Sequence, residues 1–381
     1  MNWWQKLRKN SLAQVGATIL LVFYLTVFLA EFTAPYDPYA SVPSASLLPP
    51  TTIYWRSPTT GQFLGPHVYP TTQGPVSVET GDREVFVDFE QPSPLRLFVK
   101  GDEYRWLQLR FPLPTRWSLS RPGFEEIQLF PGFRGDRHLF GAVGPGRWNI
   151  LGTDEQARDQ LSRLIHGGRI SLSIGLIGIA LSFPIGMLVG GLAGYFGGWL
   201  DAVLMRLVEV IMTIPAIFLL VALAAVLPAT LSSTQRFLLI ILITSFVRWT
   251  GLARVVRGQV LSLKSQTFVT ASQAMGGQPL YIIVKHVLPQ TATYVIISAT
   301  LAIPGFIVAE AVLSLIGLGI QQPDASWGNM LSLASDASIL VLHPWLIWPP
   351  AILIVLTVLS FNLLGDGLRD ALDPRSLRTY D

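Results

Sequence analysis

Few side chains in this sequence have the type and spacing that chemistry requires. The acid pairs Glu125–Glu126 and Asp154–Asp159 are the candidates for general acid–base work, which needs a carboxyl group close to a reacting atom. Neither pair stands beside a nucleophile or a metal-ligand pattern, and no H-E-x-x-H, G-x-S-x-G or G-x-x-x-x-G-K-[ST] motif occurs. Nothing in the sequence therefore positions either acid pair for catalysis.

Metal binding is equally poorly supported by the sequence. The chain has no cysteine, and its five histidines are scattered, so we predict no metal site. His286 has no partner at ligand spacing and is interpreted as structural. Glu310 differs, because it lies within an apolar run, and an ionisable residue inside a spanning helix indicates a translocation pathway by default. A local cap or pairing is the alternative interpretation of Glu310.

Three other charged residues within the apolar runs are interpreted individually. Arg206 and Glu209 are three positions apart, which predicts a pair along one helix. Arg248 is interpreted as a contact between helices, or as a side chain whose charge reaches the membrane surface.

The elements that must position these residues are membrane helices. Half of the 381 residues are hydrophobic and only 13% are charged, whereas soluble domains carry about 25% charged residues. A net charge of +3 without a long run of one sign gives no support for a nucleic-acid partner. The predicted fold class is an all-α membrane protein with six transmembrane helices, since about 20 apolar residues cross a bilayer. The six segments are 12–30, 170–196, 203–227, 236–255, 291–319 and 343–365.

Basic residues predict the orientation of these helices. Lys6, Arg8 and Lys9 precede the first segment, so the N-terminus is expected in the cytoplasm. Six crossings return the C-terminal end, with its arginines at 369, 375 and 378, to the same side. A cleaved signal peptide is the alternative for the first segment, but its apolar run is longer than is usual for such peptides.

Residues 34–150 have a different composition, rich in proline, polar and aromatic residues. Residues 83–90 alternate in polarity, residues 95–110 predict a hairpin with its turn at 100–103, and residues 125–130 predict a further strand. We expect a small β-rich external insert between the first and second helices. It serves either as a cap over the mouth of a transporter or as a docking surface for a soluble partner.

The segment after this insert predicts an amphipathic helix on the outer membrane surface. Thr153 is its expected N-cap, and two acids follow that favour the positive end of a helix. Arg158 and Arg163 lie off its apolar stripe, and Gly167–Gly168 is expected to link it to the second transmembrane segment.

The loop 256–289 is too polar to span and too regular for a linker. Residues 262–275 have helical spacing, and Gly276–Gly277 is expected to end that helix because glycine accepts a left-handed backbone. Pro279 suits the first turn of a second helix, which Pro289 should close. We predict a projecting helix–turn–helix whose small residues let another protein approach.

This loop resembles the cytoplasmic E-A-A-x-x-x-G loop of ATP-binding-cassette (ABC) importer permeases, in which I-x-L-P follows after nine residues. Thr270 replaces the acid, Ser272 the second alanine and His286 the isoleucine, which removes any contact based on a charge at 270. The resemblance implies that the loop is the coupling helix that seats in a groove of the ATPase subunit. The residues assigned to it are Thr270, Ala271, Ser272, Met275, Gly276, Gly277, Leu288 and Pro289.

Other stretches are similar to the C-type permease of peptide and nickel importers, and residues 95–106 resemble the outer-domain hairpin of oligopeptide-type members. Those stretches are 151–176, 256–277 and 285–290 in the loop, 313–331 and 370–375. The resemblance implies a type I ABC importer permease fold. The domains expected from it are the N-terminus with the first helix at 1–33, the insert at 34–150, the permease core at 151–376 and a tail at 377–381.

The resemblance implies the permease subunit of an ATP-driven, binding-protein-dependent importer of peptides or a related solute such as nickel. The subunit would lie in a bacterial inner membrane with both termini cytoplasmic. Because a permease does no covalent chemistry, the resemblance implies no catalytic residues, no bound cofactor and no enzymatic activity for this chain. Its implied partners are a second homologous permease, two ABC ATPase subunits that use the ATP, an external solute-binding protein and the lipid bilayer. The first alternative is a stand-alone secondary transporter that uses Glu310; the second is a membrane-anchored enzyme or adhesin built on residues 34–168.

Overall fold

The computed structural model describes residues 3–76, 83–107, 109–116, 123–228 and 231–372. The chain divides into two compact units, which are described separately. The first comprises residues 1–22, 171–320 and 353–381, and the second comprises residues 23–170 and 321–352. The expected tail at 377–381, with the arginines at 375 and 378, lies outside the described residues.

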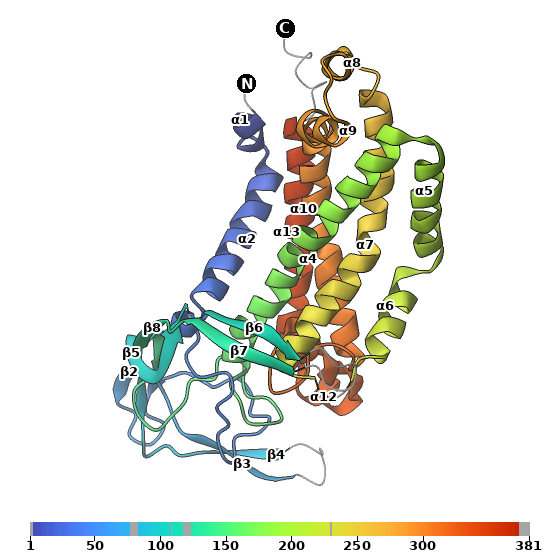
Figure 1. Ribbon diagram of the computed structural model, residues 1–381. Coiled ribbons are helices and arrows are strands. Elements are labelled where there is room, and N and C mark those ends of the chain that lie inside the picture. Colours follow the sequence, from blue (N-terminus) through green and yellow to red (C-terminus); the bar gives the residue numbers. More distant parts are fainter. Residues whose placement is uncertain (1–2, 77–82, 108, 117–122, 229–230, 373–381) are drawn as a thin grey trace. The chain divides into compact units, whose positions relative to one another are not determined.

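The first unit is built of long helices (Figure 1). Residues 23–28, 160–170 and 348–352, which are the ends of three of these helices, are assigned to the second unit. In the described residues, five helical stretches are long and apolar enough to cross a membrane, and a sixth is added if α5 and α6 form one bent span. The predicted class of a multi-span helical membrane protein is confirmed. The helices are α1 (Trp3–Leu7), α2 (Ser11–Phe28), α4 (Gln160–Phe196), α5 (Gly198–Thr213), α6 (Ala216–Ala225), α7 (Ser233–Leu263), α8 (Thr267–Ala274), α9 (Pro279–Ile282), α10 (Ala292–Leu315) and α13 (Trp348–Leu372).

The predicted third helix, 203–227, is broken rather than straight. Its two parts meet at an angle of 83°. Ile214 has an extended backbone with ψ of 125° and Pro215 follows it. A proline disfavours the helical conformation of the residue before it and removes a backbone donor, which explains a break at this position.

Pro289 does not close the second helix of the loop, as its sequence predicts, because the helical path continues beyond it. A π turn, η1 (Ile283–Val287), and a 3₁₀ turn, η2 (Leu288–Thr291), carry the chain from α9 into α10. Pro289 lies in the first turn of η2. The N–H groups in the first turn of a helix have no acceptor within that helix. A proline at such a position therefore loses no intrahelical hydrogen bond.

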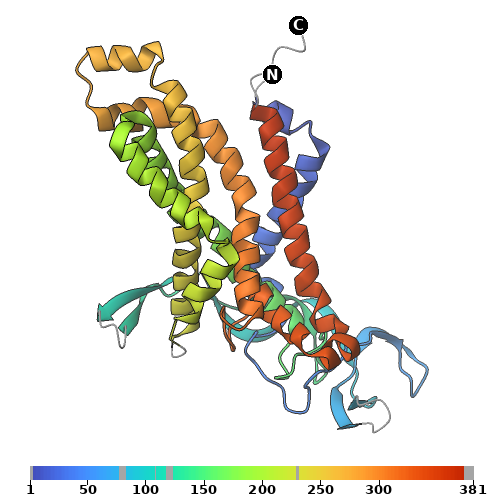
Figure 2. The same ribbon diagram turned by 90° about the vertical axis from the view of Figure 1, so that its right-hand side faces the viewer.

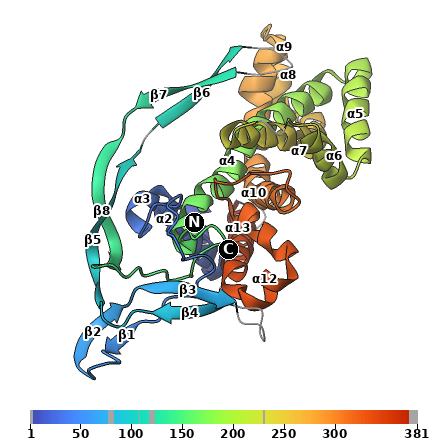
Figure 3. The same cartoon turned by 90° about the horizontal axis from the view of Figure 1, so that it is seen from below.

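The second unit contains the β-rich insert predicted between the first two spans (Figure 3). A four-stranded sheet has the order β1-β2-β5-β8, and two separate hairpins pair β3 with β4 and β6 with β7. The strands are β1 (Tyr54–Arg56), β2 (Phe63–Val68), β3 (Thr71–Val76), β4 (Arg83–Val87), β5 (Ser93–Trp106), β6 (Leu109–Arg116), β7 (Gly123–Phe130) and β8 (Phe133–Ala142). Short helical elements complete the unit, and they are α3 (Ala30–Thr33), α11 (Trp327–Leu331), η3 (Ser332–Ser335), α12 (Ala337–Leu342) and η4 (Pro344–Leu346).

The predicted hairpin with its turn at 100–103 is wrong, because β5 runs through these residues. β5 pairs with β8, and Lys100 lies opposite Arg137 while Tyr104 lies opposite Gly135. Four steps along β5 therefore match two steps along β8, which is a bulge. The polar residues that suggest a turn are accommodated as extra residues in a continuous strand.

The predicted amphipathic helix starting at Thr153 is also wrong. Thr153 and Asp159 form an isolated bridge, and α4 begins at Gln160 with the Asp159 carboxylate accepting from Ser162 N and Oγ, both at 2.7 Å. Gly168 lies inside α4, where a Cβ would stand 2.6 Å from Val27 Cγ2 and 3.1 Å from Trp327. The glycine pair thus permits close packing within a continuous helix instead of linking two helices.

Arg158 and Arg163 are buried in the second unit rather than displayed on a polar helix face. Both pair with Asp154, whose Oδ2 lies 2.6 Å from Arg158 Nη2 and 3.2 Å from Arg163 Nε. Gln322 Oε1 accepts from both arginines, at 2.8 and 3.0 Å. Buried charges need partners of this kind, and the partner from residue 322 is too distant in sequence for local patterns to reveal.

Candidate functional site

Residues 264–289 form the helix–turn–helix that the sequence predicts, whereas residues 256–263 of the predicted loop belong to α7 and the helix predicted at 262–275 begins only at Thr267. α8 ends at Ala274, and Gly276 follows with a φ of +81°, a conformation that glycine adopts at little cost. Gly276 N donates to Gln273 O and Gly277 N donates to Ser272 O, each at 2.9 Å, which satisfies the carbonyls at the end of α8. Pro279 then occupies the first turn of α9. Figure 2 shows α8 and α9 lying crosswise to the long helices α7 and α10.

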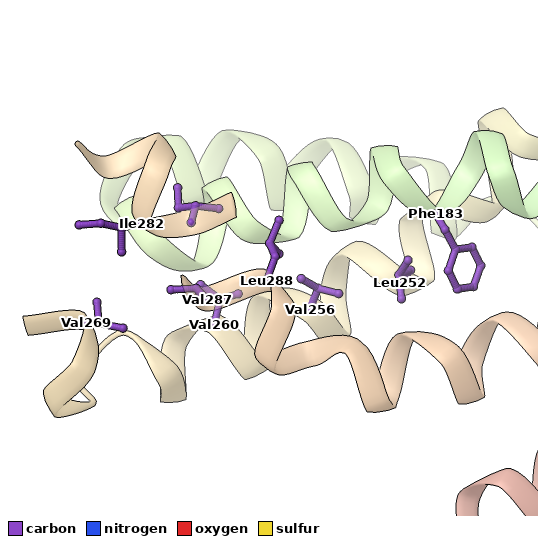
Figure 4. Packing of buried hydrophobic residues seen from close by; sticks show 9 residues of the cluster. Phe183, Leu252, Val256, Val260, Val269, Ile282, Val287 and Leu288 are labelled. Carbon is purple, nitrogen blue, oxygen red and sulfur yellow. The ribbon is translucent and has the colours of Figure 1, made fainter. Parts of the chain in front are cut away.

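One side of this loop is buried against α4 and α7. Val269, Ile282 and Val287 have no exposed surface, and Leu288 is 6% exposed. They belong to an apolar cluster that includes Phe183 of α4 and three residues of α7, as Figure 4 shows. The α7 members are Leu252, Val256 and Val260. A displacement of the loop must therefore be transmitted to both helices, because close-packed side chains resist separation.

The other side of the loop is exposed and apolar. Met275 is 82% exposed, and α8 carries no charged residue. Large exposed apolar side chains on one loop make it a candidate surface for contact with another molecule. We call this surface the outer face of the loop; it consists of Phe268, Thr270, Ala271, Met275, Leu280, Tyr281 and Val284.

The residues assigned to the loop from its sequence divide between these two sides. Thr270, Ala271 and Met275 are exposed, whereas Ser272 and Leu288 are buried. Sequence reasoning missed Phe268, Leu280, Tyr281 and Val284 of the outer face. Leu280 and Val284 are four residues apart and so share one helix face, which was the available signal.

A row of glycines joins α4 to α7 beneath the loop. A Cβ at Gly186 would stand 2.8 Å from Trp249 O, one at Gly190 2.4 Å from Ala253 O, and one at Gly194 2.8 Å from Arg257 O. Small residues spaced by four allow two membrane helices to approach at backbone distance. This row was not recognised from the sequence, although its four-residue spacing is visible there.

Polar contacts fix the same region of the first unit. Arg257 of α7 binds both carboxylate oxygens of Asp201 of α5, and Gln273 of α8 donates to the hydroxyl of Tyr195 at 3.0 Å. The first unit also has a cavity of about 430 Å³ at the ends of α7, α10 and α13. Most of its lining side chains are polar, among them Gln259 and Arg369.

Glu310 is fully buried within α10. Its Oε1 accepts from Ser314 Oγ at 2.7 Å, and Ser314 Oγ accepts from Ile320 N at 3.1 Å. This is the local pairing that the alternative interpretation of Glu310 expects.

The contacts predicted for Arg206, Glu209 and Arg248 are present. Arg206 donates to Glu209 at 3.0 Å along α5, and Arg248 of α7 donates to Gly305 O of α10 at 2.6 Å. Arg248 is therefore a contact between helices.

Comparison with known proteins identifies the family. Residues 183–378, just over half of the chain, match the family of the binding-protein-dependent transport system inner membrane component. Residues 2–50 match the N-terminal transmembrane domain of oligopeptide transport permease C.

Individual relatives are similar over the same part of the chain. The oligopeptide transport system permease protein OppC of Haemophilus influenzae is 42% identical over 228 residues, which cover 60% of this chain and 71% of the relative. The dipeptide transport system permease protein DppC of Bacillus subtilis is 43% identical over 236 residues, covering 61% and 71%. The glutathione transport system permease protein GsiD of Pectobacterium atrosepticum is 38% identical over 232 residues, covering 61% and 74%.

These matches confirm the resemblance inferred from the motifs and exclude the enzyme and adhesin alternative. The chain belongs to the family of binding-protein-dependent transport inner membrane components and is a multi-pass, OppC- and DppC-like permease subunit of an ABC transporter, not an enzyme.

Proposed function

We propose that this subunit serves an importer of peptides, with short peptides and glutathione-like molecules as the substrate class. Its relatives are named for oligopeptide, dipeptide and glutathione transport. None of these three names includes nickel, and in the described residues no group of three His, Cys, Asp or Glu side chains is placed to hold a metal ion. The nickel alternative therefore loses its support.

The partners in this proposal are a second homologous permease, two ABC ATPase subunits and an external solute-binding protein. The family's dependence on a binding protein and its ABC membership support the last two classes. This chain has no motif for ATP, so the ATPase subunits use it. Both termini and the loop 256–289 face the cytoplasm, in agreement with the basic residues around the first segment, and the insert 34–150 lies outside.

The observation that carries the mechanism is the two-sided construction of the loop. Its outer face offers an uncharged apolar surface to a groove of the ATPase, while Val269, Ile282 and Val287 tie it to α4 and α7. ATP binding closes the ATPase pair and displaces the loop. The apolar cluster transmits that displacement to α4 and α7, and the glycine contacts between these two helices make them move together.

The permease then changes between an inward-open and an outward-open arrangement. Coupling requires such a two-state element, whose equilibrium both the ATPase and the solute bias. The cavity lined by Gln259 and Arg369 is the proposed inner end of the solute path. The secondary-transporter alternative has no supporting observation, because Glu310 is engaged locally.

The experiment that tests this proposal replaces one side chain of the outer face. Met275→Asp should lower transport and binding-protein-stimulated ATP hydrolysis about tenfold or more, because burial of such a side chain contributes about 1.5–3 kcal/mol. Gln278→Asp is the matched control, since it adds the same charge three residues away at an exposed N-cap, where Asp is favoured. Equal activity of the two variants would show that the outer face does not bind the ATPase.

A further inference from the structure

The second unit carries a row of aromatic side chains that begins at the end of α2. α2 has 18 residues and is apolar enough to span a membrane. At 1.5 Å per residue it is about 27 Å long, close to the hydrocarbon thickness of about 30 Å. Phe28, its last residue, therefore reaches the edge of the hydrocarbon layer.

Trp106 of β5 is held at the same level. Its Nε1 donates to Phe28 O at 3.1 Å, and the centroids of the two rings are 5.6 Å apart. Phe133 of β8 follows at 6.3 Å from Trp106, and Phe130 at 5.5 Å from Phe133. We call these four residues the aromatic row. Figure 3 shows β5 and β8, which carry its inner members, side by side.

The aromatic row is exposed although it is apolar. Phe28 is 51% exposed, Phe133 59% and Phe130 37%. It continues a stripe along α2, since Leu21 and Leu25 are 67% and 55% exposed and lie on the same helix face as Phe28. Exposed apolar side chains on a spanning helix face lipid. The aromatic row extends that lipid-facing surface onto the β-ribbon, by which we mean the paired strands β5 and β8.

The next pair of residues along the ribbon is basic. Arg105 lies directly opposite Arg134, beside the pair formed by Trp106 and Phe133. Like charges at such positions repel each other, and neither arginine has an ion-pair partner within the part of the chain that the structure describes. Neighbouring residues of a strand point to opposite faces, so these arginines lie on the side of the ribbon away from the aromatic rings.

This two-sided arrangement fits the interfacial layer of a phospholipid bilayer. The headgroup region extends about 5–7 Å beyond the hydrocarbon on each side. Rings at the edge of the hydrocarbon layer would contact acyl chains. The arginines, on the opposite face of the ribbon and further from the hydrocarbon, would contact lipid phosphates. Tryptophan is enriched at this depth because its ring is apolar and its N–H needs a partner, which Phe28 O supplies here.

We infer that the aromatic row, with Arg105 and Arg134, anchors the β-rich insert in the lipid headgroup layer on its own side of the membrane. The occupant of this surface is phospholipid. The anchor limits the motion of the insert relative to the end of α2, which goes beyond the proposed transport function.

The absence of cysteine allows a direct test with the full chain, purified with its co-purifying subunits in phospholipid nanodiscs. A fluorophore is attached to Phe133→Cys, and Phe63→Cys is the matched control, because Phe63 is a 68% exposed aromatic residue on β2 of the same sheet. Quenching by a lipid with a nitroxide near the carbonyl group should be at least twofold stronger at 133 than at 63. Iodide in the water should give the opposite order.

Two results would overturn the anchor. Equal iodide quenching at both sites would place the row in water, and protection of position 133 from both quenchers would mean that protein covers it. Phe130→Cys repeats the measurement should the first variant fail to fold.

The arginines are tested separately on the Phe133→Cys chain. Adding about a third of anionic phosphatidylglycerol to the nanodisc should strengthen lipid quenching, because the negative surface potential attracts basic groups. Arg105→Gln with Arg134→Gln should abolish that response. An unchanged response in the double variant would remove both arginines from the anchor.

Discussion

Gly190 of α4 lies against the backbone carbonyl of Ala253 of α7, so closely that a Cβ at 190 would stand 2.4 Å from the oxygen. This contact is the middle of three along the two helices, between those of Gly186 and Gly194. Two helices that meet at backbone distance move together. The loop 256–289 rests on this pair, so the contact connects the proposed ATPase surface to the spanning region.

A single methyl group tests this contact. Gly190→Ala should lower the unfolding temperature of the purified protein, because overpacking costs about 1–3 kcal/mol. Gly251→Ala of α7 is the control, since a Cβ there meets nothing within 4 Å and alanine favours a helix by about 1 kcal/mol. Opposite signs of the two shifts are expected in differential scanning fluorimetry, and a stabilising Gly190→Ala would contradict the close packing.

The turn between α8 and α9 should be sensitive to any side chain. Gly276→Val forces a β-branched residue to a φ of +81°, at a cost of about 1–3 kcal/mol. ATP hydrolysis should continue while transport falls several-fold, with the chain still inserted in the membrane. Gly258→Val is the control, because a Cβ at this α7 position meets no atom within 4 Å and φ is not positive. Wild-type transport by Gly276→Val would count against the turn as a coupling element.

Loss of the Asp154 carboxylate should strongly destabilise the second unit, because two buried arginines depend on it. Asp154→Ala leaves Arg158 and Arg163, which are 3% and 1% exposed, without their carboxylate, a change that costs about 3–5 kcal/mol. Lys100→Ala removes a solvent-exposed ion pair with Asp136 and should cost less than about 1 kcal/mol. Protease digestion of the two variants measures the difference, and similar digestion rates would disprove the buried network.

The buried carboxyl group of Asp159 should make the stability of the folded protein depend on pH. Burial raises the pKa of its carboxyl group from 3.8 to about 6, against the hydrogen bonds from Ser162 and the charge of Arg147, and Asp154 adds to the rise. The folded state thus binds a proton that the unfolded state releases between these values, so this group makes the protein less stable as pH rises from 4 to 6.

The Asp159→Asn variant should lose that part of the pH dependence and keep the cap on Ser162 N. Unfolding temperatures of the wild type and the variant at pH 4.5 and 7 measure the effect. If the difference between the two proteins is the same at both pH values, the assignment to Asp159 is wrong.

The spans and the turn at Gly276 could be predicted from the sequence because their causes are local. Apolar length indicates a span, and a glycine pair before a proline indicates a turn between helices. The break at Pro215 could be predicted only in part, because a proline in a membrane helix either bends the helix or is accommodated without a break. Pro289 shows the second outcome, since the π and 3₁₀ turns accommodate it in a continuous helical path.

Contacts between distant residues could not be predicted. Arg158 and Arg163 were expected on a polar helix face because their acceptor, Gln322, lies about 160 positions away. The residues 100–103 have the composition of a turn, and only the pairing of β5 with β8 shows that they form a bulge. For the outer face, Leu280 and Val284 became recognisable once Ile282 and Val287 were seen to be buried.

The central claim is that this chain works as the permease of an ATP-driven importer through the loop 256–289. The most direct measurement is a mild-detergent pull-down of the tagged chain from its native membrane, with mass spectrometry and an ATPase assay. The account predicts a second permease and P-loop ATPases in the complex, with vanadate-sensitive hydrolysis that a solute-binding protein stimulates and Met275→Asp reduces. Recovery of the chain alone, without ATPase activity after crosslinking, would contradict it.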